Sequence, residues 1–310
     1  MRKLLSPLLI IISVILPVLA IISLRNHVLE QNINWSHLAQ NAYELWPLLL
    51  LVVLMMPINW AIEITKWKSL RNTNFKSATR EVLSGLGLAF FTPNRIGEAG
   101  GRLIGVPEGK RWQAGASFVY SSLAQSLCTL WAGIAGFCFF QPFKITFLSQ
   151  NILFIALILS IILGLLLYFN LQKLIGFIPF GRKWKAKLDQ VSEIPNAILL
   201  KVLLLSISRY LIFSFQFALL IQWLDPTAAF FHVLAGIAIT YLLCALVPGS
   251  ALAELGIRES AGVLIIGLIA NPIAVVSATF ILWLINLAGP SLIGTRILGR
   301  NINALKPSTV

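Results

Sequence analysis

The sequence predicts an all-α polytopic membrane protein, and its composition carries that prediction. Apolar residues make up 58% of the 310 residues and charged residues 11%, with a mean hydropathy of +0.86. Soluble domains carry roughly 25% charged residues, so this composition excludes an ordinary soluble domain. In addition, apolar windows of about 20 residues, the length of a helix that crosses a hydrocarbon core, recur along the chain.

We expect about six full transmembrane helices, each a predominantly apolar run bounded by polar residues. The first run follows Arg2 and Lys3 but lacks the small-residue exit of a cleaved signal sequence, so we interpret it as a retained helix. Tryptophans at span ends are typical of interfacial anchors, and four stand there: Trp46, Trp67, Trp112 and Trp223. The predicted spans are 4–24, 46–64, 113–140, 152–169, 198–223 and 272–297.

Two further regions, 82–106 and 229–270, are apolar but interrupted by proline, glycine and charge. The first of them holds Arg95, Glu98 and Arg102. Each charge at the centre of a lipid-facing helix costs roughly 2.5–3.5 kcal/mol, whereas each large apolar residue returns only about 0.3–0.6 kcal/mol. Region 82–106 is therefore predicted to dip into the membrane and return, or to lie buried against other helices beside a polar cavity.

Proline predicts where this region reverses. Pro93 disfavours helix at Thr92 and has no backbone N–H to donate, so a half-helix over 82–92 is expected to end there. A return half-helix is then expected from about Ile96. Its glycines would let the two backbones approach closely; they are Gly97, Gly100, Gly101 and Gly105.

An internal echo relates the two interrupted regions. The pattern E-x-G-x-R occurs at Glu98–Arg102 and again at Glu254–Arg258, each time after a proline, Pro93 or Pro248. The flanking spans are expected to run in opposite senses in the two halves, which is typical of inverted-repeat transporters, although chance also produces short echoes. We therefore predict one transmembrane domain, 1–310, with inverted halves 46–140 and 198–297 and additional helices at 1–24 and 152–169.

The charged residues at membrane depth are the candidate site. Within each motif the Glu and the Arg are i,i+4 neighbours on one helix face, which favours either an ion pair that joins helices or a binding site. Arg95, Arg209 and Glu259 add to them and give four Arg against three Glu, an excess suited to a phosphate. The candidate substrate-binding residues are Arg95, Glu98, Arg102, Arg209, Glu254, Arg258 and Glu259, and the candidate structural residues of the motifs are Pro93, Gly97, Gly100, Gly101, Pro248, Gly249 and Gly256.

The net charge of +13 indicates membrane orientation rather than nucleic-acid binding. Of the 24 Lys and Arg residues, 17 lie in segments that alternate spans would place on one side, which predicts that both termini are cytoplasmic. No spacing of the three Cys or three His residues is typical of a metal site, so neither a metal nor a cofactor is expected. The basic segments are 1–3, 65–80, 107–112, 170–197 and the tail from Arg296.

The stretches "FFTPNRIGEAGGR" and "VPGSALAELGIRES" resemble two segments of a known family. This is the membrane portion of lysylphosphatidylglycerol synthase/flippase proteins, together with the stand-alone flippase-like proteins related to it. The resemblance covers nearly the whole chain and implies an inner-membrane protein that moves or binds a lipid, such as an aminoacylated phospholipid, a hopanoid or a polyprenyl-linked sugar. The second stretch is less glycine-rich than is usual in the family. By motif match, the resemblance implies functional roles for Pro93, Arg95, Gly97, Glu98, Arg102, Gly256, Arg258 and Glu259.

Three functions remain open at this stage. The first is movement or binding of an anionic phospholipid or a polyprenyl-phosphate lipid, without catalysis. The second is a membrane-embedded transferase acting on a polyprenyl-phosphate donor, with Glu98 or Glu254 as a base. The third is a non-catalytic scaffold that recruits envelope-lipid enzymes through basic loops such as 182–187. No synthase domain is expected, so aminoacyl transfer from tRNA is not expected either.

Overall fold

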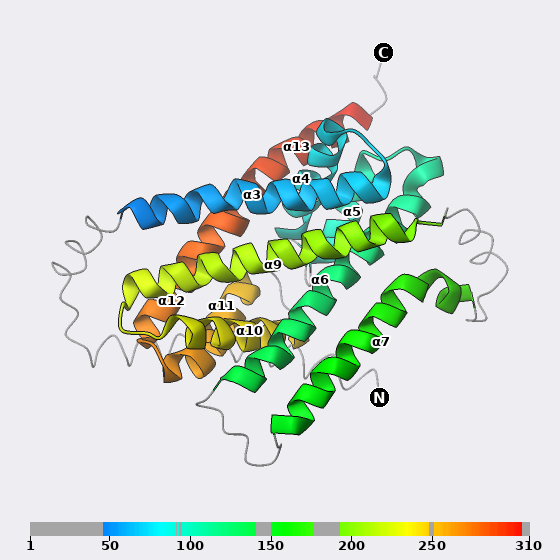
Figure 1. Ribbon diagram of the computed structural model, residues 1–310. Helices are drawn as coiled ribbons and strands as arrows, with labels where there is room; N and C mark the ends of the chain where they lie inside the picture. The colour runs from blue at the N-terminus through cyan, green and yellow to red at the C-terminus, as the bar shows by residue number, and fades with distance from the viewer. Residues whose placement is uncertain are drawn as a thin grey trace, which may run out of the picture. The chain divides into compact units, whose positions relative to one another are not determined.

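The computed structural model describes residues 46–90, 92, 95–140, 150–176, 193–247 and 251–305, which form helices and no β-strand (Figure 1). The predicted all-α class is confirmed. The predicted span 4–24, the basic loop 182–187, and the motif residues Pro93, Pro248 and Gly249 lie outside the described residues.

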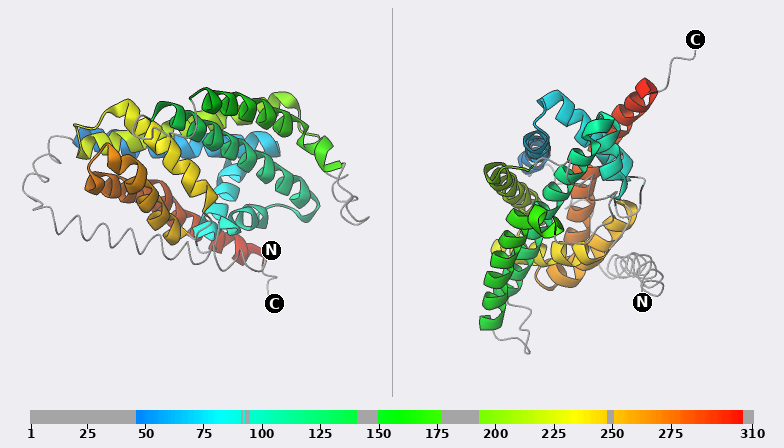
Figure 2. Two further views of the ribbon diagram at one scale, coloured as in Figure 1. Left: turned by 90° about the horizontal axis from the view of Figure 1, so that it is seen from below. Right: turned by 90° about the vertical axis from the view of Figure 1, so that its right-hand side faces the viewer.

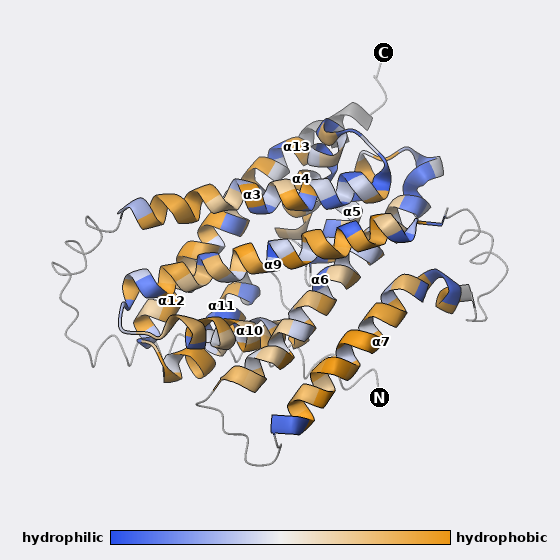
Figure 3. Cartoon of the chain, viewed as in Figure 1, coloured by the Kyte–Doolittle hydropathy of each residue, from blue (hydrophilic) through white to orange (hydrophobic). Residues whose placement is uncertain are grey.

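Five helical segments of the described chain are long and apolar enough to cross a membrane, and each overlaps one of the predicted spans. The chain is thus an all-α polytopic membrane protein. Figure 3 shows the apolar character most clearly on α7, which is hydrophobic along nearly its whole length. The five segments are α3 (Trp46–Arg71), Glu108–Phe139, which includes α6 (Arg111–Phe139), α7 (Gln150–Gly176), α9 (Asn196–Leu224), and Pro272–Gly299.

The last of these spans is not one regular α-helix. It consists of α12 (Pro272–Trp283), a π-helical turn (Leu284–Ala288) and α13 (Gly289–Leu305). The π-turn carries Asn286, whose buried side chain donates hydrogen bonds to Gln216 Oε1 at 2.9 Å and to a carbonyl oxygen of the preceding turn. Because lipid offers no hydrogen-bonding partner, such buried amides join helices.

Region 82–106 forms a helical hairpin, α4 (Phe75–Phe90) and α5 (Gly97–Ile104), whose two helices lie side by side (Figures 1 and 2). Its glycines lie at the contact. A Cβ atom added at Gly101 would lie 2.5 Å from the Ser84 carbonyl oxygen, and one at Gly97 would lie 2.8 Å from the Leu88 carbonyl oxygen. Thr92 Oγ1 accepts a hydrogen bond from Gly97 N at 2.9 Å and so satisfies the first backbone N–H of α5.

Region 229–270 also contains two short helices, α10 (Phe230–Leu246) and α11 (Ala251–Ile265), followed by a 3-10 turn (Ile266–Leu268). A polar contact ties the ends of this region together. Asp225, in the loop after α9, accepts hydrogen bonds from Thr227 Oγ1 at 2.6 Å and from the Asn271 backbone N–H at 2.7 Å, next to the start of α12. The loop before α10 is thereby fixed to the loop before α12.

The contacts divide the chain into two compact units, and the long helices contribute to both. The predicted halves 46–140 and 198–297 are a different division, and the inverted repeat stays a prediction. Unit 1 comprises the described residues of Met1–Asn59, Ala132–Phe154 and Leu211–Gly289, and unit 2 those of Trp60–Trp131, Ile155–Tyr210 and Pro290–Val310.

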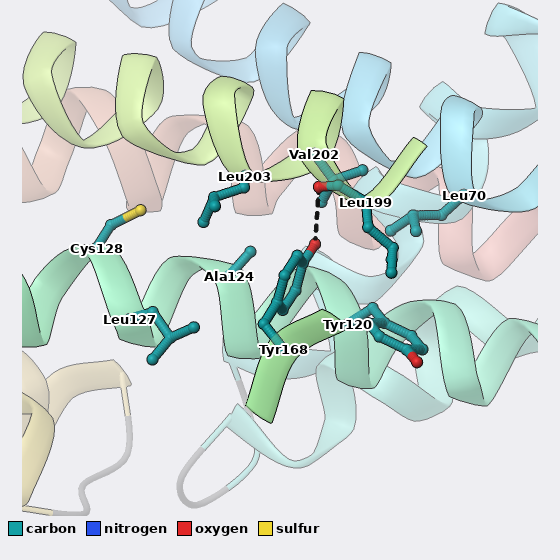
Figure 4. Close-up of a cluster of buried hydrophobic side chains, with 9 residues drawn as sticks. All are labelled: Leu70, Tyr120, Ala124, Leu127, Cys128, Tyr168, Leu199, Val202 and Leu203. Atoms are coloured by element: carbon teal, nitrogen blue, oxygen red, sulfur yellow. Dashed lines mark hydrogen bonds between the residues drawn. The ribbon is translucent and has the colours of Figure 1, made fainter. Parts of the chain in front are cut away.

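An apolar cluster at the contact of α6, α7 and α9 forms part of the core of unit 2 (Figure 4). Tyr168 of α7 is fully buried there and donates a hydrogen bond to the Leu199 carbonyl oxygen at 3.2 Å. Its ring packs edge-on against Tyr120 with centroids 5.8 Å apart. Near it, Gly164 leaves room for Leu127 and Trp131 of α6. These contacts hold the otherwise lipid-compatible α7 within unit 2.

Candidate functional site

The hairpin of unit 2 buries Arg102. It lies in the last turn of α5 and is 2% exposed. Its Nη2 donates to Glu98 Oε1 at 2.6 Å, so the predicted i,i+4 ion pair is confirmed. The same Nη2 also donates to Glu63 Oε1 of α3 at 2.8 Å. One guanidinium nitrogen therefore joins α5 to α3.

Glu63 is the centre of the charge network. Besides Arg102, its carboxylate contacts Lys66 Nζ at 3.2 Å, one turn along α3, and Arg209 Nη1 of α9 at 3.2 Å. Arg209, predicted as a site residue, thus lies in the same cluster as the first motif. Glu63 and Lys66 are themselves buried, with side chains 4% and 1% exposed.

Lys66 was not predicted as a site residue, and the helix extends beyond residue 64, where the predicted span ends. Helix α3 continues to Arg71 and buries Lys66 completely. A lysine after an apolar run usually marks the end of a membrane span, whereas here the carboxylate of Glu63 pairs with it inside the protein. The i,i+3 spacing of the two residues was the available signal.

Arg95 completes the cluster from the turn between the hairpin helices. Its Nη2 lies 3.2 Å from Glu98 Oε2, and its side chain is 34% exposed. Its backbone is left-handed, with φ of 53°, a conformation that costs a non-glycine residue on the order of 1–3 kcal/mol. This strain accompanies the placement of the guanidinium beside Glu98.

Aromatic rings cover the cations. The ring centroids of Trp67 and Phe118 lie 4.8 and 5.5 Å from the guanidinium carbon of Arg102. The ring centroid of Trp60 lies 5.5 Å from the guanidinium carbon of Arg209. Such contacts strengthen when the cation is removed from water. The predicted role of Trp67 as an interfacial anchor is wrong, since it is fully buried and donates to Glu81 Oε2 at 2.6 Å.

Arg102 has buried N–H groups without an acceptor among the described residues. Its Nε and Nη1 are buried and find no hydrogen-bond partner among the residues that the structure describes. Nε carries one N–H and Nη1 two, so three of the five guanidinium N–H groups are unsatisfied by these residues. Leaving buried donors unpaired costs about 1–3 kcal/mol each in proteins, which makes this edge of Arg102 a place for an acceptor.

We call these residues the Arg102 cluster: Glu63, Lys66, Arg95, Glu98, Arg102 and Arg209. It contains four cations and two carboxylates. The unsatisfied donors of Arg102 favour an anionic acceptor beside it.

The second motif lies in unit 1 and forms a simpler site. Arg258 Nη2 contacts Glu254 Oε1 at 2.6 Å, which confirms the second predicted pair. The rings of Phe213 and Tyr241 lie 5.6 and 5.7 Å from the Arg258 guanidinium carbon. Glu259, also on α11, is partly buried and forms no ion pair with a described residue.

The predicted site residues thus fall into two groups. Arg95, Glu98, Arg102 and Arg209 meet in unit 2, whereas the second-motif residues Glu254, Gly256, Arg258 and Glu259 lie on α11 in unit 1. In the described part of the chain, no group of three His, Cys, Asp or Glu side chains is placed to hold a metal ion.

Comparisons with protein-family models, with curated proteins and with solved structures gave no match to this chain. The resemblance to the lysylphosphatidylglycerol synthase/flippase family therefore rests on the two motifs alone and stays a prediction.

Proposed function

We propose that the chain binds the phosphate of an anionic lipid at the Arg102 cluster and moves that lipid across the membrane. The observation that carries this proposal is the buried edge of Arg102, with Nε and Nη1 directed to no acceptor among the described residues. Phosphate oxygens are the acceptors that a planar guanidinium pairs best.

The surroundings support a ligand that is part lipid. The cluster joins α5 to α3 and α9, and the described surface of unit 2 carries exposed large apolar side chains such as Ile96, Leu200 and Leu204. Arg102 would hold the charged phosphate, while the lipid tails attached to it would contact these exposed apolar side chains. A free soluble anion would gain nothing from such a location.

Movement would use the sharing of Arg102 between two carboxylates. Glu63 and Glu98 both accept from Nη2, so Arg102 can turn its other donors to a phosphate and remain paired throughout. This keeps the cost of the buried charges low at each stage. We propose the cytoplasmic membrane as the location, with both termini on the cytoplasmic side, because of the distribution of basic residues.

The test is lipid movement in proteoliposomes of the purified protein. An acyl-labelled anionic lipid is placed in both leaflets, and the labels that reach the outer surface are bleached by an impermeant reductant. The wild-type protein is expected to expose the inner-leaflet label, and Arg102→Gln is expected to abolish this exposure.

Arg111→Gln is the matched control, because Arg111 forms an exposed pair with Glu108 at 3.3 Å outside the cluster. It is expected to retain full movement. Equal movement by the wild type and Arg102→Gln would refute the proposal. Product formation from a labelled polyprenyl-phosphate donor would instead favour a transferase, and co-purification of envelope-lipid enzymes without lipid movement would favour a scaffold.

A further inference from the structure

We infer that Lys66 is a second phosphate-binding residue, which contacts another oxygen of the same phosphate that Arg102 holds. This inference rests on the proposed function and adds to it the residue at the inner end of the site. It follows from the donors of Lys66 that have no acceptor and from the position of Lys66 beside Arg102.

Lys66 has more hydrogen-bond donors than partners. Its side chain is 1% exposed, and its Nζ donates to Glu63 Oε2 at 3.2 Å. An ammonium group carries three N–H donors, and Lys66 has no second acceptor among the residues that the structure describes. Two N–H groups of a fully buried charged side chain are thus left for another acceptor, and leaving such groups unpaired is costly.

The carboxylate of Glu63 does not need Lys66 to be paired. Glu63 Oε1 accepts from Arg102 Nη2 at 2.8 Å, and Glu63 Oε2 lies 3.2 Å from Arg209 Nη1. An ion pair that only joined helices would therefore be complete with the two arginines. Lysine is almost never fully buried unless it is paired, and it binds phosphate in proteins as a point charge. The burial of Lys66 beside an already paired carboxylate favours a contact with a ligand.

Lys66 and Arg102 lie on the two oxygens of one carboxylate. Lys66 contacts Glu63 Oε2, whereas Arg102 contacts Oε1. Because both oxygens are bonded to the same carbon atom, one phosphate can reach both cations. A phosphodiester has two non-bridging oxygens, so one can accept from the unsatisfied Nε and Nη1 of Arg102 and the other from Nζ of Lys66. The flexible stem of lysine lets its ammonium turn to the phosphate while it keeps its bond to Glu63.

The exposure of the side chains falls along the cluster from the hairpin turn toward α3. The side chain of Arg95 is 34% exposed, that of Glu98 18% and that of Arg102 3%. Lys66, at 1%, is the most deeply buried cation of the cluster. A headgroup that enters beside Arg95 therefore meets Arg102 first and Lys66 last, so Lys66 would hold the phosphate once it is fully bound.

The experiment is competitive lipid retention measured by native mass spectrometry. Purified protein in detergent receives equal amounts of dioleoylphosphatidylglycerol and dioleoylglycerol, which share their tails and differ in the phosphate headgroup. We expect the wild type to prefer the phospholipid. Lys66→Met should reduce this preference by about tenfold, the effect of losing one hydrogen bond to a charged group. Lys66→Arg keeps a charged donor and should retain most of the preference.

Lys68→Met is the matched control, because Lys68 lies on the same helix, two residues away, and is exposed. It is expected to leave the preference unchanged. Melting temperatures without added lipid separate a ligand contact from a structural role. Lys66→Met should melt at or above the wild-type temperature, because it removes a buried charge while Glu63 keeps Arg102 and Arg209 as partners.

An unchanged lipid preference in Lys66→Met would overturn the inference and leave the proposed function standing. A lower melting temperature with equal loss of both lipids would overturn it too, because Lys66 would then be structural. If Lys66→Met does not fold, Lys66→Gln, which keeps a donor to Glu63 without the charge, gives the same comparison; loss of folding in both variants also identifies a structural lysine. Failure of the proposed function looks different, because the wild type would then retain the phospholipid no better than dioleoylglycerol.

The source of the phosphate is distinguished by adding inorganic phosphate to the phospholipid-loaded wild type. Displacement of the lipid identifies the phosphate ion itself as a sufficient ligand, and persistence identifies a lipid-borne phosphate. The contact with Lys66 is supported in either case when Lys66→Met weakens retention and Lys68→Met does not.

Discussion

The tight hairpin of unit 2 gives a prediction that separates two adjacent glycines of α5. Gly101 faces α4, and a Cβ atom there would lie 2.5 Å from the Ser84 carbonyl oxygen and 2.8 Å from Gly85 Cα. Gly100 is exposed, and a Cβ atom there would meet only Leu88 Cδ2, at 3.7 Å. Alanine substitutions at the two positions therefore differ only in the atoms that the added Cβ atom contacts.

The magnitude follows from these distances. The Cβ atom at Gly101 falls about 0.9 Å short of the 3.4 Å at which ordinary contact begins, and the obstructing atoms belong to the backbone. The gain in helix propensity, about 1 kcal/mol for glycine to alanine, is common to both variants. Their difference thus isolates the clash, which typically costs about 1–3 kcal/mol in an overpacked site.

Thermal unfolding of the purified variants in detergent measures this difference. We expect Gly101→Ala to melt roughly 5 °C or more below Gly100→Ala. Arg102 follows Gly101 directly, so Gly101→Ala is also expected to weaken lipid retention at the cluster, whereas Gly100→Ala retains it. Equal melting temperatures would show that the two helices of the hairpin do not pack as closely as described and would refute the reasoning.

Two further predictions concern unit 1. Burial alone would raise the pKa of Asp225, but hydrogen bonds from Thr227 and Asn271 outweigh burial and hold this pKa below its usual range. The ionised carboxylate therefore stabilises the fold by about 1 kcal/mol above the unfolded pKa of about 3.9. This stabilisation is lost as the pH falls through the folded pKa. The melting temperatures of wild type and Asp225→Asn should accordingly differ at neutral pH and converge as the pH falls through the lowered folded pKa, and a constant difference would contradict this. Separately, Gln216→Leu or Asn286→Leu should each cost about 1–2 kcal/mol by leaving the other amide without its 2.9 Å hydrogen bond. The double variant should cost less than the two single losses added together, and strict additivity would show that the amides do not interact.

Features that depend on local spacing were predictable from the sequence. The long apolar runs predicted the spans, proline predicted the break between α4 and α5, and the i,i+4 spacing predicted the pairs Glu98–Arg102 and Glu254–Arg258. In each case the interacting groups lie within a few turns of one helix, so the helical period alone brings them together.

Contacts between distant segments are not set by the spacing along one helix. Glu63 meets Arg102 from 39 residues away, and it also meets Arg209 of α9. Lys66 and Trp67 are buried because they have partners inside the protein, Glu63 for Lys66 and Glu81 for Trp67. Their positions at the end of an apolar run do not indicate this burial. Hydropathy registers a charge as a cost and contains no information about a distant partner that offsets it.

The pair of Glu63 and Lys66 has a consequence for biosynthesis. Both residues belong to α3, which emerges from the ribosome before α5 and α9, the helices of Arg102 and Arg209. Since their i,i+3 contact lies within one helix, the growing chain can present α3 to the insertion machinery with these two opposite charges already paired. The later arginines then join a carboxylate that is already in the bilayer. The order of synthesis thus allows α3 to be inserted with these two opposite charges paired before their distant partners arrive.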